Sequence, residues 1–133
     1  MLTQEPQEGQ TPNILFIHYR PCSVPIDYYD LFTEKAKEDN SLNLERICTY
    51  SNSQYSDLEA ECKEKEEESY NFVLIPNLNG ILEEVRKHYD GKIIGYGLPN
   101  NKESYDEFID CTISERKSPQ FSKKFLEEVK KFI

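Results

Sequence analysis

Short apolar runs alternate with segments of helical periodicity along most of this chain, and this alternation limits its fold more than any other feature. The runs typical of strands are residues 13–19, 42–50, 71–76, 92–97 and 110–114. The segments with helical spacing of apolar residues are 26–40, 56–69, 79–89, 102–109 and 118–133. Strands that alternate with helices in this way predict a parallel sheet covered on both faces, because parallel strands need helical crossovers.

Right-handed crossovers leave few arrangements of five such strand–helix units. We therefore predict a three-layer, doubly wound (βα)5 fold of the flavodoxin-like kind, with a parallel five-stranded sheet of order 2-1-3-4-5. Residues 1–12 are polar and contain two prolines and a glycine, so we expect a disordered lead-in there. Residues 13–133 then form a single α/β domain, which is an ordinary domain size.

Charge and cysteine spacing narrow the function. The net charge of −9 disfavours nucleic-acid binding, which needs clustered Lys and Arg, and favours a protein partner with a basic surface. No apolar run reaches the ~18 residues of a membrane span, and the first residues lack the features of a signal peptide, so we expect a cytoplasmic protein without a membrane partner. The four cysteines stand singly, without a C-x-x-C pair, and we expect no metal and no cofactor.

The candidate site lies where the predicted strands end, because ligands of doubly wound sheets bind beyond the carboxyl ends of the strands. The residues at these ends are His18, Tyr19, Arg20, Pro76, Asn77, Tyr96, Gly97, Arg116 and Lys117. The segment GYGLPNNKESY (residues 95–105), at the end of the fourth strand, reads as a mobile loop on the same edge, and loops on a rigid scaffold often carry binding. We therefore interpret this edge as an interaction surface.

Over residues 12–133 the order of elements resembles that of a response-regulator receiver domain. The run NILFIHY resembles the receiver strand that ends in two acidic residues, with His18 and Tyr19 in their positions. YNFVLIPNLNG resembles the strand that ends in the phospho-accepting aspartate, and Pro76 stands in its place. KIIGYG resembles the strand that ends in Thr or Ser, and Gly97 stands there.

The last part of the resemblance is CTISERKSPQF, which is similar to the final receiver strand and its lysine-proline turn, with Arg116 or Lys117 near the lysine position. Receiver phosphorylation needs a carboxylate nucleophile and a Mg²⁺ ion held by oxygen ligands. Since Pro76 cannot accept a phosphoryl group, the resemblance implies a degenerate, phosphorylation-independent pseudo-receiver. Such a module is not an enzyme and acts by binding other proteins, and many receivers form homodimers through their fourth and fifth elements.

Two alternatives stay open. The run ILFIHYR also resembles the opening box of TIR domains, and SYNFVLIPNLNGILEE is similar to their glutamate-containing region. That resemblance implies an assembly role or an NAD hydrolase with Glu83 or Glu84 as the catalytic residue, although the chain has no tryptophan to match the Trp-Cys pair of those domains. The second alternative is a domain that binds a nucleotide or a flavin, but no G-x-G-x-x-G or P-loop is present to hold a phosphate.

Overall fold

A computed structural model describes residues 2–3, 11–20, 28–50, 56–111 and 120–133. Its main sheet has five parallel strands in the order β3-β2-β5-β6-β7. The strands are β2 (Asn13–Arg20), β3 (Asn43–Tyr50), β5 (Phe72–Pro76), β6 (Ile93–Gly97) and β7 (Glu107–Asp110). The prediction of an α/β fold around a five-stranded parallel sheet is therefore confirmed.

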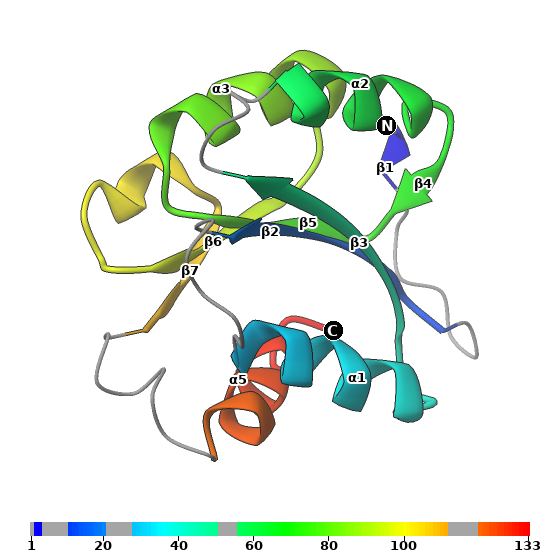
Figure 1. Cartoon of the computed structure of the whole chain (residues 1–133), viewed down its shortest axis with the longest axis vertical. Coiled ribbons are helices and arrows are strands. Elements are labelled where there is room, and N and C mark those ends of the chain that lie inside the picture. Colours follow the sequence, from blue (N-terminus) through cyan, green and yellow to red (C-terminus); the bar gives the residue numbers. More distant parts are fainter. Residues whose placement is uncertain (1, 4–10, 21–27, 51–55, 112–119) are drawn as a thin grey trace.

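Helices cover both faces of this sheet (Figure 1). On one face lie α1 (Tyr28–Glu38) and α5 (Phe121–Lys130), and on the other lie α2 (Ser56–Glu64) and α3 (Asn79–His88). Two short strands, β1 (Leu2–Thr3) and β4 (Ser69–Tyr70), pair in parallel as a separate small sheet that the prediction lacks. One of them, β1, lies within the segment expected to be disordered.

The predicted fourth helix over residues 102–109 is wrong. The chain forms a single 3-10 turn, η1 (Lys102–Ser104), and then enters β7 at Glu107, three residues before the predicted strand. The Asp106 carboxylate accepts a hydrogen bond from the backbone N–H of Ile93, and its own N–H donates to the Ile93 carbonyl, so the segment joins β6. Phe108 and Ile109 consequently pack on opposite faces of the sheet, as neighbours in a strand do.

Each face of the sheet carries its own apolar cluster, because successive strand side chains point to opposite sides. Ile14 and Phe16 lie in the cluster under α1 and α5, whereas Leu15 and Ile17 lie in the cluster under α2 and α3. The described part of the chain contains no helix with the length and apolarity that a membrane crossing requires.

A histidine at the end of α3 links this helix to the turn after α2. His88, the last residue of α3, has Nδ1 2.5 Å from Oε1 of Glu66, in the turn after α2, and Nε2 3.2 Å from Oε1 of Glu84. The hydrogen bond from His88 lowers the pKa of Glu66. Burial raises the pKa of Glu84, but hydrogen bonds from His88 and Lys87 outweigh burial, so this pKa is also lowered.

Carboxylates with a lowered pKa stabilise the fold above their ordinary pKa, and this stabilisation is lost as the pH falls through the lowered value. We therefore expect that, as the pH falls from about 5 to about 3, the free energy of unfolding decreases less in His88→Ala than in the native chain. Urea denaturation at a series of pH values measures the two slopes. The exposed Lys123 on α5 supplies the control, Lys123→Ala, which should keep the native slope. Equal slopes for His88→Ala and the native chain would contradict the link.

Candidate functional site

The carboxyl ends of the main strands lie on the left of the view in Figure 1. A pocket of about 460 Å³ is lined by residues at this edge of the sheet. It is lined by Tyr19, Tyr29, Pro76, Asn77, Leu78, Tyr96, Gly97, Leu98, Asn100 and Asn101. These residues come from the ends of β2, β5 and β6, from the start of α1, and from the segment after β6. The volume falls within the range of about 300–1,000 Å³ that ligand pockets have.

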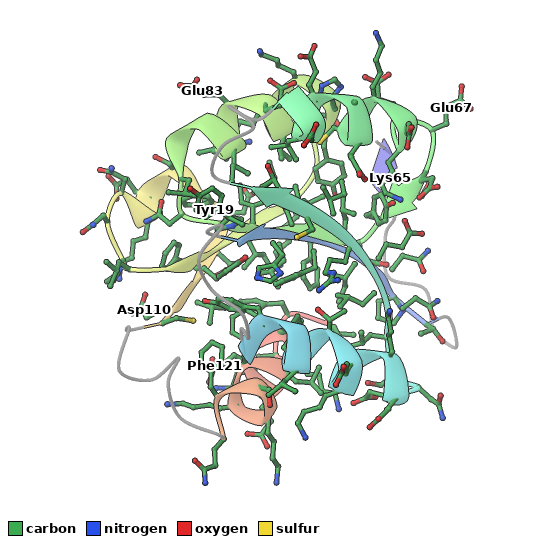
Figure 2. The ribbon with its side chains drawn as sticks, in the orientation of Figure 1. Tyr19, Lys65, Glu67, Glu83, Asp110 and Phe121 are labelled. Atoms are coloured by element: carbon green, nitrogen blue, oxygen red, sulfur yellow. The ribbon has the colours of Figure 1, made fainter. Side chains whose placement is uncertain are left out.

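Residues from both faces of the sheet line the pocket. Tyr19, near the end of β2 (Figure 2), packs against the cluster under α2 and α3. Tyr29 and Tyr96 belong to the cluster under α1 and α5. The Tyr96 hydroxyl donates a 2.8 Å hydrogen bond to the Ile17 carbonyl. The ring of Phe16 stacks on Tyr96, with centroids 5.5 Å apart and an interplanar angle of 10°. These contacts fix the position of the Tyr96 ring.

Asn77 holds the loop that forms one wall of the pocket. Its Nδ2 donates to the carbonyls of Leu98 (2.7 Å) and Asn100 (2.5 Å), which uses both of its N–H groups. Its Oδ1 accepts a 2.8 Å hydrogen bond from the Tyr105 hydroxyl. Burial raises the pKa of Tyr105, so this hydroxyl keeps the proton that it donates. We call residues 98–101 the clamped loop.

Two residues with positive φ lie at the two ends of this loop, one directly before it and one at its last position. Gly97, the last residue of β6, has φ +125°, a conformation that residues other than glycine rarely adopt. Asn101 closes the loop at φ +54°, in the left-handed region where asparagine is enriched. Leu98 lies between them with 45% of its surface exposed, an unusual exposure for a large apolar side chain in this fold.

We expect Asn77→Asp to release the clamped loop. The change replaces both N–H donors with an oxygen that faces two carbonyl oxygens, which should cost about 1–3 kcal/mol of the free energy of unfolding. Hydrogen exchange of the amides in residues 98–101 should quicken at the same time. The control is Asn40→Asp in an exposed turn, where the same change of charge should leave that exchange unaltered. Unchanged exchange in Asn77→Asp would show that the hydrogen bonds do not hold the loop.

The structure brings together five of the residues that the sequence singled out: Tyr19, Pro76, Asn77, Tyr96 and Gly97 line one pocket. His18 does not line it, since its side chain is fully buried beside the rings of Phe16 and Tyr29. Arg20 ends β2, but its side chain is outside the described residues. Arg116 and Lys117 also lie outside them.

Five further residues line the pocket: Tyr29 and Leu78, which sequence reasoning did not select, and Leu98, Asn100 and Asn101, which lie in the loop predicted at this edge. The last three have a signal in the sequence, because a Leu-Pro-Asn-Asn segment directly after a strand marks a turn at the edge of the sheet. Tyr29 has no such signal. Its spacing within the helical segment predicts only a core position.

The two alternative catalytic glutamates do not line the pocket. Glu83 extends from α3 away from the sheet (Figure 2), and Glu84 pairs with Lys87 and His88 on the same helix. One acid, Asp110, ends β7 at the carboxyl edge and is exposed, but it is not part of the lining. Within the described residues, no three His, Cys, Asp or Glu side chains gather into a group able to hold a metal ion.

Within the part of the chain that the structure describes, the lining is therefore aromatic, amide and aliphatic, without a charged residue. It offers rings, apolar contacts and side-chain amides, which suit the binding of an uncharged group. Comparison of the chain with protein-family models, with curated proteins and with solved structures finds no match.

Proposed function

We propose that this chain is a non-enzymatic, phosphorylation-independent pseudo-receiver that binds another protein through the carboxyl edge of its sheet. One observation carries the proposal: a pocket at that edge whose described lining residues are all uncharged, with a wall that Asn77 holds in place and with Leu98 exposed beside it. Preformed pockets are the usual places of recognition in proteins, and Leu98 adds an exposed apolar contact beside this one.

Two features support the receiver-like part of the proposal. We take the fold to be a flavodoxin-like unit of order 2-1-3-4-5 in which the 3-10 turn η1 replaces the fourth helix. Pro76 ends β5 and lines the pocket where the resemblance puts the phosphorylated aspartate, and it has no side-chain oxygen to accept a phosphoryl group. The negative charge of the chain favours a partner with a basic surface, and homodimers through the fourth and fifth elements belong to the same proposal.

An affinity experiment with two matched variants tests the proposal. The whole chain, immobilised, is exposed to a lysate of the cells that make it, and the retained proteins are measured by mass spectrometry. Leu98→Arg puts a cation beside the pocket, and Thr11→Arg adds the same charge at an exposed position before β2, near the opposite edge of the sheet. We expect one protein retained by the native chain and by Thr11→Arg and lost with Leu98→Arg.

Two results would overturn the proposal. One is the absence of any retained protein, and the other is equal retention by Leu98→Arg. Two further assays test whether the chain is phosphorylated like a receiver or hydrolyses NAD. Addition of Mg²⁺ and beryllofluoride, a phosphoryl mimic, should leave the amide resonances of Asn77 and Gly97 in place, whereas shifts there would indicate a receiver-type phosphorylation site. Release of nicotinamide from NAD would favour the TIR-like alternative.

A further inference from the structure

The charge of the lining residues limits which chemical groups the pocket can bind. None of the described residues that line it carries a charge, and the side-chain amide of Asn77 has both N–H groups engaged by the clamped loop. Among the described lining residues, a phosphate, a carboxylate or an ammonium group would find no opposite charge to compensate for its lost hydration, which is costly. An uncharged group fits this lining best.

The rings of the pocket point to the shape of that group. Tyr29 and Tyr96 have ring centroids 5.0 Å apart and are 4% and 3% exposed, so they form a preformed wall. Tyr19, half-buried, completes the aromatic part of the lining from the other face of the sheet. Aromatic rings favour aromatic neighbours at centroid separations of about 4.5–7 Å, and a ring buries about 150–250 Å² when it enters such a site.

The clamped loop adds two asparagine side chains to the lining. Asn100 and Asn101 line the pocket and are exposed, and their side-chain amides make no hydrogen bond to any described residue. An asparagine amide offers two donors and an acceptor, which complement the carbonyl and N–H of a peptide bond. These amides stand next to Leu98, which adds an exposed apolar contact.

We infer that the pocket receives an uncharged aromatic side chain of the partner protein, and that Asn100 and Asn101 pair with the peptide groups on either side of it. This inference rests on the proposed function, since it names what the partner presents. The aromatic ring lies against Tyr29 and Tyr96, and the flanking peptide groups lie over the clamped loop.

A titration with small probes tests the inference without the partner. N-acetyl-L-tyrosinamide carries the ring and both flanking amides without a charge, and it is added to the whole ¹⁵N-labelled chain. We expect saturable shifts at the amides of Tyr96, Gly97 and Asn100, with an affinity in the millimolar range. N-acetyl-L-leucinamide should bind about threefold to tenfold more weakly, because an aromatic pair is favoured over an aliphatic contact by such a factor. The doubly charged phosphotyrosine analogue should bind more weakly still.

The variant Asn100→Ala/Asn101→Ala should weaken binding of the tyrosinamide probe, whereas Thr11→Ala should not. The inference is overturned by an absence of saturable shifts, by equal affinity for the leucine probe, or by preference for the phosphorylated probe. Probe binding without any retained protein overturns the proposed function and leaves the pocket assignment standing. A protein that is retained and then lost with Leu98→Arg, without probe binding, overturns the aromatic assignment alone.

Discussion

Replacement of Phe16 with alanine is expected to lower the free energy of unfolding by about 3–5 kcal/mol, the usual cost of removing a buried aromatic side chain. Phe16 is fully buried in the middle of β2 and lies at the centre of the aromatic cluster under α1 and α5. Its ring centroid lies within 6.3 Å of those of His18, Tyr29, Phe32, Tyr96 and Phe125.

Urea denaturation of the native chain and the variant measures this cost. Phe132→Ala is a suitable control, because Phe132 is only partly buried at the border of the same cluster and should cost less than half as much. Phe16→Leu keeps most of the volume and should fall between the two. A cost below about 1 kcal/mol for Phe16→Ala would mean that the cluster can collapse around the gap.

The same substitution should also affect the pocket. Phe16 stacks on Tyr96, and Tyr96 and Tyr29 are the two buried rings of the lining. Where Phe16→Ala remains folded, the tyrosinamide probe should therefore bind more weakly than it does to the native chain. Stability and binding are coupled here because the core cluster and the pocket share residues.

The core was predictable wherever a sequence pattern allowed one interpretation. The run from Ile14 to Ile17 is apolar at every position, which is typical of a strand covered on both faces, and all of its side chains are buried. The spacing of Phe121, Phe125 and Val129 indicates a helix, and the structure has α5 there with all three buried. Over residues 102–109 the apolar spacing fits a helix or a strand, and only the distant bonds between Asp106 and Ile93 decide in favour of β7.

The site was predictable as a place but not as a set of residues. A parallel sheet brings the carboxyl ends of its strands to one edge, so Pro76 and Tyr96 were expected there. Whether a side chain at that edge faces the pocket depends on what covers it. His18 alternates with Tyr19 along β2 and is buried beside Tyr29, while Tyr19 lines the pocket. Tyr29 joins the lining only because α1 packs across the edge, which no local pattern reveals.

Gly95→Ala is the substitution that best links the sheet to the clamped loop. A Cβ at Gly95, in β6, would lie 2.7 and 2.8 Å from Cδ1 and Cγ of the Tyr105 ring and 2.9 Å from Cδ2 of Phe108. These separations are shorter than carbon atoms tolerate, so both rings must move. Overpacking of this kind costs about 1–3 kcal/mol, and we expect the upper part of that range because Tyr105 is buried in the cluster under α2 and α3 and the partly buried Phe108 packs against it.

A double-mutant cycle with Tyr105→Ala identifies the cause. If the clash with Tyr105 dominates, Gly95→Ala should cost less in the Tyr105→Ala background by about 1 kcal/mol or more. The Tyr105 hydroxyl donates to Asn77, so a displaced Tyr105 should also loosen Asn77 and quicken amide hydrogen exchange in residues 98–101. Additive costs in the cycle would assign the strain to Phe108. A loop that keeps its native exchange in Gly95→Ala would show that Asn77 holds the carbonyls of Leu98 and Asn100 without support from Tyr105, so that the pocket wall depends on Asn77 alone.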